Sequence, residues 1–189
     1  MSFLHPEKIP LEKAVEMVNE QRDTRRQNAG CRAQSRAEAQ KGRDMKIVLA
    51  SSSPRRKELL QTAGIDFEID VEGVDEVPQG DTPEEKVCSI AEQKCRPVAA
   101  RRFDDCVIGA DTVVSVDGDI LGKPHDREDA KNMLRRLSGR EHTVYTGVCI
   151  SAHGKETVFS EATKVKFFDL TDKEIADYVL SGEPMDKAR

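Results

Sequence analysis

The stretch Val48-Leu-Ala-Ser-Ser-Ser-Pro-Arg-Arg-Lys-Glu58 joins an apolar strand, a serine turn and the basic start of a helix. Ser53 is placed to cap that helix, and Pro54 suits its first position. Amide N–H groups at a helix start and neighbouring arginines together favour an anion. The stretch therefore predicts a β-turn-α unit that binds phosphate groups.

Strands and helices alternate along the rest of the sequence. Apolar or β-branched runs predict strands at Lys46–Ser51, Ile65–Val71, Cys106–Val116, Val144–Ser151 and Thr157–Phe168. Capping and stop signals predict helices from Pro54 to Gly64, after Thr82-Pro-Glu-Glu85, from Asp126 to Leu137, and after Thr171-Asp-Lys-Glu174. Asp117-Gly118 and His153-Gly154 favour hairpin turns, and Pro97 is expected to kink or shorten the second helix. This pattern predicts an α/β fold with a mixed sheet flanked by helices.

Composition narrows the class of protein. The chain has 189 residues, 37% of them hydrophobic, which is enough for one domain with a core. A net charge of -5 argues against a protein that coats nucleic acid, so a bound phosphate must meet a local basic cluster. No apolar run reaches about 18 residues, and the N-terminus lacks a signal pattern. These features predict a cytoplasmic protein without a membrane partner.

Cysteines and histidines give no sign of a metal site. The five cysteines show no C-x-x-C spacing, which favours reduced thiols over disulfides or structural zinc. The four histidines are scattered and are expected to be surface or turn residues: His5, His125, His142 and His153.

The chain divides at Met45. Residues 1–44 contain a short amphipathic stretch, Pro10 to about Gln21, followed by a polar Arg/Gln/Ala-rich run. We expect a partly helical or disordered extension there, and a domain over residues 45–189.

Several charged residues downstream could join the serine turn in one site. Asp111 interrupts an apolar strand, where a buried carboxylate needs a cation, a metal or hydrogen bonds. Lys123 lies between Gly122 and Pro124, which would fix its backbone. Taken alone, Asp111 could equally cap a strand end, and Lys123, Glu76 and Lys94 could be ordinary solvated charges.

Together the motifs resemble the Maf family of nucleoside triphosphate pyrophosphatases. They occur in the family's order over Met45 to Ala188: Ser51-x-Ser-Pro-Arg-Arg56, Asp75-Glu76, Ala91-Glu-Gln-Lys94, Gly109-Ala-Asp-Thr112, Leu121-Gly-Lys-Pro124 and Leu137-Ser-Gly…His142-x-Val-x-Thr-Gly147. The resemblance implies a fold like that of Maf and inosine triphosphate pyrophosphatases. It also implies cleavage between the α- and β-phosphates with Mg²⁺ or Mn²⁺, and it leaves a homodimer open.

The resemblance also implies roles for individual residues. Asp111 would be the proton acceptor, with Lys94 and Lys123 as catalytic cations. Glu76 and Asp111 would hold the metal, whose preference for oxygen ligands they suit. The residues expected to bind the substrate or set its specificity are Ser51, Ser53, Arg55, Arg56 and Thr112.

Arg55 and Thr112 match the family branch that hydrolyses dTTP and UTP, whereas the 7-methyl-GTP branch departs at both points. The resemblance therefore favours a dTTP/UTP pyrophosphatase, with modified pyrimidine nucleotides as further substrates in a house-cleaning role. A nucleotide-binding regulator of septum formation that needs no turnover is the non-enzymatic alternative. A third reading makes Ser53-Pro54 a phosphorylation site on a flexible loop, which the strand and helix around it disfavour.

The end of the chain departs from the family pattern. Family members continue from the stretch matching Glu183 to Ala188 into further strand and helix, including a substrate-contacting glutamine. We expect this chain to lack that segment, which puts its turnover in question.

Overall fold

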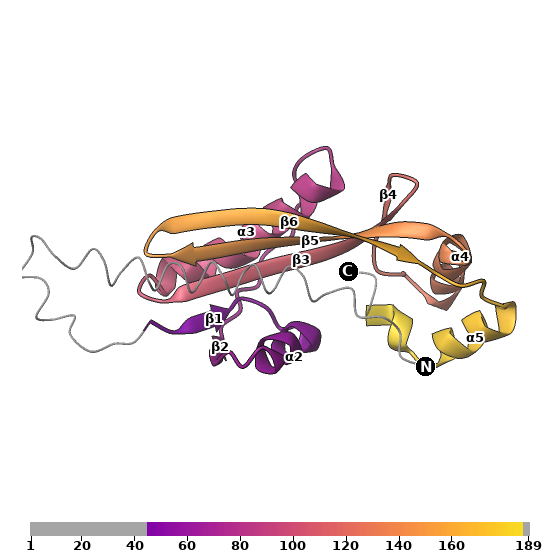
Figure 1. Cartoon of the computed structure of the whole chain (residues 1–189), viewed down its shortest axis with the longest axis horizontal. Helices are drawn as coiled ribbons and strands as arrows, with labels where there is room; N and C mark the ends of the chain where they lie inside the picture. Colours follow the sequence, from indigo (N-terminus) through magenta and orange to yellow (C-terminus); the bar gives the residue numbers. More distant parts are fainter. Residues whose placement is uncertain (1–44, 187–189) are drawn as a thin grey trace, which may run out of the picture.

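The structure is a computed structural model that describes residues 45–186, so the predicted extension over residues 1–44, with its amphipathic stretch, lies outside the described residues. Its centre is one mixed sheet in the strand order β2-β1-β3-β5-β6, with β4 paired to β3 (Figure 1). The strands are β1 (Ile47–Leu49), β2 (Phe67–Ile69), β3 (Cys106–Val116), β4 (Asp119–Leu121), β5 (Glu141–Ala152) and β6 (Lys155–Lys166). The predicted α/β class with a mixed sheet is confirmed.

Strand direction changes at β3. β1 pairs in parallel with both β2 and β3, whereas β3 pairs antiparallel with β4 and β5, and β5 antiparallel with β6. Both predicted hairpin turns are present: Asp117 and Gly118 have φ of 53° and 85°, and His153 and Gly154 have φ of 50° and 75°. Two consecutive positive φ angles are what the tight turn of a right-twisted hairpin requires.

Helix α2 (Pro54–Thr62) follows the serine turn and buries Leu60. Ser53 is its N-cap residue, but the Ser53 hydroxyl makes no capping hydrogen bond, contrary to the prediction. Pro54 has no N–H to offer, and the backbone N–H of Ser53 donates to Ser51 Oγ at 3.2 Å instead. The amides of the first turn are therefore not satisfied by the predicted cap.

Helix α3 (Pro83–Arg101) covers one face of the sheet and packs on β3, β5 and β6. Its predicted capping box is present, because Glu85 N–H donates to Thr82 Oγ1 while the Glu85 carboxylate accepts from Thr82 N–H. Pro97 does not shorten it; the helix continues to Arg101. Apolar packing of Val98 on the sheet compensates for the backbone hydrogen bond that Pro97 cannot make.

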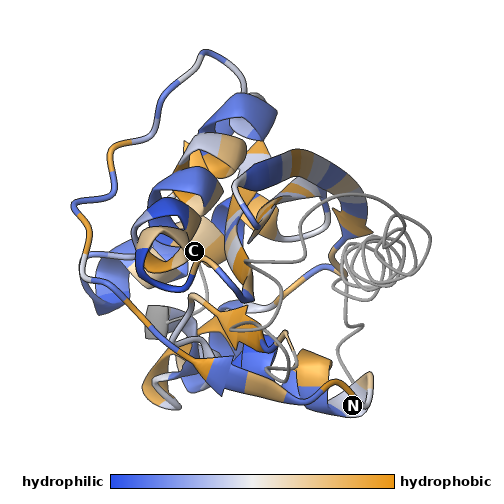
Figure 2. Cartoon of the chain, turned by 90° about the vertical axis from the view of Figure 1, so that its left-hand side faces the viewer, coloured by the Kyte–Doolittle hydropathy of each residue, from blue (hydrophilic) through white to orange (hydrophobic). Residues whose placement is uncertain are grey.

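Three further helical segments lie at one end of the long strands (Figure 1): α4 (Arg127–Leu137), α5 (Asp172–Leu180) and the 3₁₀ turn η1 (Glu183–Asp186). Apolar residues of α4 and α5 form a small core of their own, and Phe167 joins it to residues of β3 and β4. The helices carry both hydrophobic and hydrophilic residues (Figure 2), as expected of helices with one face on the core. No helix among residues 45–186 is long and apolar enough to cross a membrane.

His142 differs from its prediction as a surface or turn residue. It is 5% exposed at the start of β5, and its ring packs edge-on against Phe167 with the ring centroids 4.8 Å apart. Burial lowers the pKa of His142 below the ordinary value of 6.5. Aromatic packing where β6 leads toward α5 explains the burial, which the local sequence does not reveal.

Candidate active site

The candidate site lies beside a gap in the sheet. One edge of β3 pairs with β1 as far as Ile108 and with β4 only from Val114 onward, so the described strands leave residues 109–113 unpaired on that edge. The other edge pairs with β5 throughout this region. Asp111 and Thr112 therefore occupy a strand that is held firmly on one side and open on the other.

Lys94 connects two carboxylates at this position. Its Nζ lies 2.8 Å from Asp111 Oδ1 and 3.2 Å from Glu76 Oε1. The side chains are 16% exposed for Lys94, 9% for Asp111 and 23% for Glu76, so the cluster is only partly open to water. The structure thus brings together three of the predicted site residues from a helix, a strand and a loop.

Two glycines bring α3 close enough for this contact. A Cβ on Gly109 would lie 2.5 Å from the carbonyl oxygen of Ala91, and one on Gly147 would lie 2.4 Å from the carbonyl carbon of Val87. Gly147 stands directly opposite Asp111 in the β3–β5 register. Because neither glycine has a side chain, the helix backbone rests on the sheet and Lys94 reaches the carboxylate.

The loop that carries Glu76 is tied to α3 by side chains. Gln93 Nε2 donates to the carbonyl of Val77 at 2.8 Å, and Gln93 Oε1 accepts from the Val77 N–H at 3.1 Å. Ser89 Oγ accepts from Gln79 N–H at 2.9 Å. Gln93 lies inside the Ala91–Lys94 motif but was not among the predicted site residues, because its side chain carries no charge that would single it out.

A second cluster joins the serine turn to β3. Arg56 donates from one guanidinium nitrogen to Ser51 Oγ at 3.1 Å and from another to Thr112 Oγ1 at 3.3 Å. Thr112 Oγ1 also lies 3.1 Å from Thr146 Oγ1 on β5. Thr146 was not among the predicted site residues, although it is the threonine of the His142-x-Val-x-Thr-Gly147 motif. The strand register places it opposite Thr112.

The two clusters approach β3 from opposite faces of the sheet. Asp111 and Thr112 are consecutive, so their side chains point to opposite sides. Asp111 faces α3, whereas Thr112 lies on the face of Ala110 and Val148, which belong to the core cluster away from α3. The lysine–carboxylate group and the arginine–hydroxyl group therefore flank the same gap.

The remaining predicted residues are Ser53, Arg55 and Lys123, which lie in the segments that follow β1 and β4, the two strands that bound the gap. Ser53 is partly buried at the start of α2, and Arg55 is exposed on its first turn. Lys123 is exposed in the segment after β4. Because β4 runs antiparallel to β3 and ends opposite Val114, the chain leaving it heads toward Thr112.

The donor set suits a hard divalent cation. Glu76 and Asp111 converge on one ammonium group, so their oxygens point into a shared space. No group of three or more candidate metal ligands occurs within residues 45–186. Mg²⁺ commonly takes one or two carboxylates and completes its coordination with substrate phosphates and water, so two carboxylates fit it.

The sequence matches the model of one protein family, described as Maf-like protein, over residues 46–189. The chain belongs to the Maf family. Maf relatives named dTTP/UTP pyrophosphatase, from Bacillus anthracis and from Bacillus cereus strain AH820, are each 51% identical over 144 residues, covering 76% of this chain and 75% of the relative.

The solved structures that match this chain are more distant in sequence. The Staphylococcus aureus Ham1 protein superposes with a TM-score of 0.47 and 17% identity over 64% of this chain and 71% of its own. A nucleoside-triphosphatase, or dITP/XTP pyrophosphatase, of Mycobacterium abscessus gives a TM-score of 0.44 and 19% identity over 65% of this chain and 74% of its own.

Proposed function

We propose that this protein hydrolyses dTTP and UTP between the α- and β-phosphates, releasing the nucleoside monophosphate and pyrophosphate. The observation that carries the proposal is the pair of clusters around Asp111 and Thr112, found in a member of the Maf family. The names of the 51% identical relatives support the pyrimidine substrates.

The cationic side chains suit a triphosphate, which carries close to four negative charges. Arg56 presents a guanidinium fixed by Ser51 and Thr112 on one side of the gap, and Lys94 presents an ammonium on the other. Arg55 and Lys123 would add charge from the exposed ends of their segments. Neutralising the phosphates lowers the barrier to attack by water.

Asp111 is the proposed proton acceptor. Water attacks the α-phosphorus, the bond from that phosphorus to the oxygen bridging to the β-phosphate breaks, and the carboxylate of Asp111 takes the proton lost by the water. A divalent cation held by Glu76 and Asp111 would polarise the phosphoryl oxygens when bound. Lys94 holds the Asp111 carboxylate in one orientation through its 2.8 Å hydrogen bond.

The test measures pyrophosphate released from dTTP, UTP, CTP and 7-methyl-GTP, each with Mg²⁺ or Mn²⁺. We expect dTTP and UTP to be hydrolysed fastest, and Asp111→Asn to lower kcat by about 100-fold or more, as loss of a general base does. Asp104→Asn, at an exposed position near the C-terminal end of α3, is the charge-matched control.

Two results would overturn the proposal. One is no pyrophosphate release from any of the four nucleotides by the folded protein, and the other is full activity of Asp111→Asn. A preference for 7-methyl-GTP would replace the pyrimidine assignment. A cytoplasmic location and a homodimer stay predictions from the sequence.

A further inference from the structure

The Thr112 hydroxyl is shared by two partners. Its oxygen accepts a hydrogen bond from Arg56 at 3.3 Å and lies 3.1 Å from the hydroxyl oxygen of Thr146. A guanidinium can only donate, so the Arg56 bond occupies one lone pair of Thr112 Oγ1. The second bond joins two hydroxyls, either of which can donate.

Both bonds depend on one side-chain torsion. Threonine carries its hydroxyl and its methyl group on the same carbon, so a rotation of about 120° about χ1 replaces one by the other. Thr146 stands opposite Thr112 in the β3–β5 register and selects the rotamer in which the hydroxyl faces both partners. In any other rotamer, Thr112 Oγ1 would no longer accept this hydrogen bond from Arg56.

Arg56 in turn spans two elements. Its other nitrogen donates to Ser51 Oγ at 3.1 Å, and Ser51 is 6% exposed at the end of β1. The guanidinium plane is therefore fixed by one hydroxyl on the serine turn and one on β3. A planar, pre-oriented guanidinium binds phosphate oxygens at less entropic cost than a mobile one.

We propose that Thr146 is a positioning residue: it fixes the Thr112 hydroxyl and, through it, the Arg56 guanidinium that receives the substrate's phosphates. This assignment rests on the proposed function for its substrate. In this role Thr146 makes no contact with the substrate itself. Its loss should weaken substrate binding and leave the chemical step at Asp111 intact.

Thr146→Val keeps the shape of the side chain and removes its hydroxyl. We expect it to raise KM for dTTP about three- to tenfold, the usual net effect of one hydrogen bond, with kcat within about twofold. Thr146→Ser retains the hydroxyl and should stay close to wild type. Thr157→Val, at the far end of β6, makes the same chemical change outside the site and should leave both constants unchanged.

A double-mutant cycle separates positioning from a general packing effect. If Thr146 acts through Thr112, Thr146→Val should have no further effect in a Thr112→Val background. Urea unfolding of each variant checks that the fold persists. An unchanged KM in Thr146→Val, an equal loss in Thr146→Ser, or a full additional loss in the Thr112→Val background would each overturn the assignment.

Binding of inorganic tripolyphosphate, measured by calorimetry, tests the positioning role of Thr146 without requiring hydrolysis. It therefore separates this proposal from the proposed pyrophosphatase function. If wild type releases no pyrophosphate from any nucleotide, the proposed function fails on its own. The positioning role then stands if Thr146→Val binds tripolyphosphate three- to tenfold more weakly than wild type, and fails if the two bind equally.

Discussion

Lys94 compensates the negative charge of two carboxylates that are largely shielded from solvent. The Asp111 side chain is 9% exposed, and burying a carboxylate costs free energy unless a counter-charge or hydrogen bonds compensate. Lys94 supplies the charge and also contacts Glu76. The same ammonium therefore contributes to stability and orients the proposed proton acceptor.

Lys94→Met should destabilise the fold as well as reduce activity. We expect a loss of about 2 kcal/mol in the free energy of unfolding, less than for a fully buried pair because these side chains retain some exposure. Urea denaturation measures the loss. Lys131→Met, which removes the exposed Lys131–Glu128 pair on α4, should cost at most about 0.5 kcal/mol. Equal losses in the two variants would contradict the role assigned to Lys94.

His142 should make stability fall in mild acid. Burial lowers its pKa below 6.5 in the folded state, whereas the unfolded chain retains the ordinary value. The unfolded state therefore takes up the proton first as the pH drops. The contribution of the neutral imidazole is complete above about pH 6.5 and declines below it.

Unfolding midpoints measured between pH 5 and pH 8 test this, with other acid-sensitive groups common to all variants. His142→Phe keeps an aromatic ring against Phe167 and should flatten the pH dependence in this interval. His125→Gln, at an exposed position, should not. Unchanged pH dependence in His142→Phe would rule out this histidine as the source.

Elements whose signals are local were predictable from the sequence. The capping boxes of α3 and α5 and the two hairpin turns each depend on residues within a few positions of one another, and all four are present. Pro97 does not shorten α3, because packing of the helix on the sheet, a non-local effect, outweighs one missing hydrogen bond. Gln93 and Thr146 lie inside motifs that the sequence shows, but their contacts join distant segments, so no local pattern could indicate which groups they bind.

Because α3 packs closely on the sheet at Gly147, we expect Gly147→Ala to lower both stability and activity. The new Cβ would lie 2.4 Å from a backbone carbon of Val87, so the helix must shift outward. We expect a loss of about 1–3 kcal/mol in the free energy of unfolding, typical of overpacking, together with reduced activity as Lys94 moves away from Asp111.

Gly73→Ala is the matched control, because a Cβ there meets nothing within 4 Å. Its free energy of unfolding should change by less than about 0.5 kcal/mol. Chemical denaturation measures the free energy of unfolding of both variants, and pyrophosphate release measures their activity. A Gly147→Ala protein as stable and active as Gly73→Ala would show that the helix does not depend on this contact.

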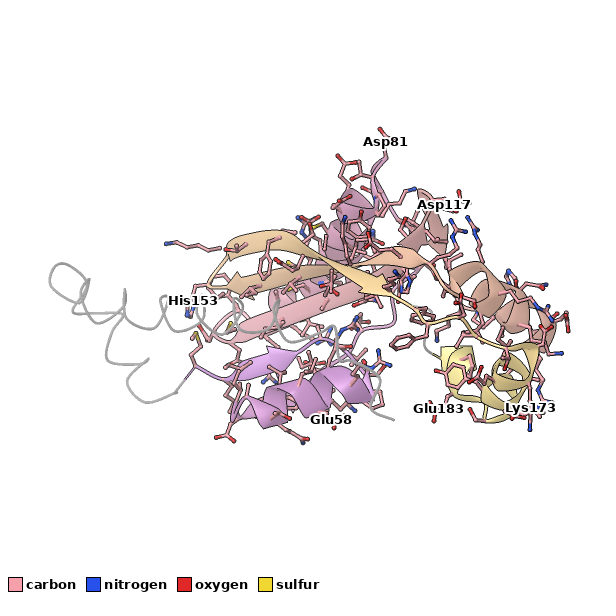
Figure 3. All side chains as sticks on the ribbon, turned by 45° about the vertical axis from the view of Figure 1, so that its right-hand side comes forward. Glu58, Asp81, Asp117, His153, Lys173 and Glu183 are labelled. Atoms are coloured by element: carbon pink, nitrogen blue, oxygen red, sulfur yellow. The ribbon has the colours of Figure 1, made fainter. Side chains whose placement is uncertain are left out.

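At the scale of the whole molecule, the apolar clusters differ in size. One cluster of seven buried residues lies between the sheet and α3, and another of seven lies on the opposite face of the sheet. The cluster between α4 and α5, at the end of the long strands, has four and is the smaller core. Figure 3 shows this separation: His153, in the β5–β6 turn, lies at one end, and Lys173 and Glu183 lie at the other. Phe167 packs against both the α4–α5 cluster and the cluster around Val116.

This division predicts unequal local stability. Amide hydrogen exchange in native conditions should be faster in α4 and α5 than in the centres of β3 and β5, because fewer buried contacts hold the smaller core. Exchange followed by mass spectrometry measures it. Uniform protection across these four elements would indicate that the molecule opens only as one unit.

The sequence predicted the mixed sheet but not its strand order. Parallel pairing of β1 with both β2 and β3 brings together segments far apart in the chain, such as Leu49, Ile69 and Ile108. Hydrophobic periodicity shows which faces are buried and gives no neighbour for a strand. The site residues were therefore predicted one by one from the family resemblance, and the sheet supplied their arrangement.

Backbone pairing sets both ends of the gap beside residues 109–113. Pairing of β3 with β1 stops at Ile108, and pairing with β4 begins at Val114. Sliding β4 by two residues along β3 keeps every side chain on its own face and moves one boundary by roughly 7 Å. The length of the hairpin after Val116 is thus a means of changing how much of the β3 edge stays unpaired beside the proposed site, separate from the side chains proposed to perform the chemistry.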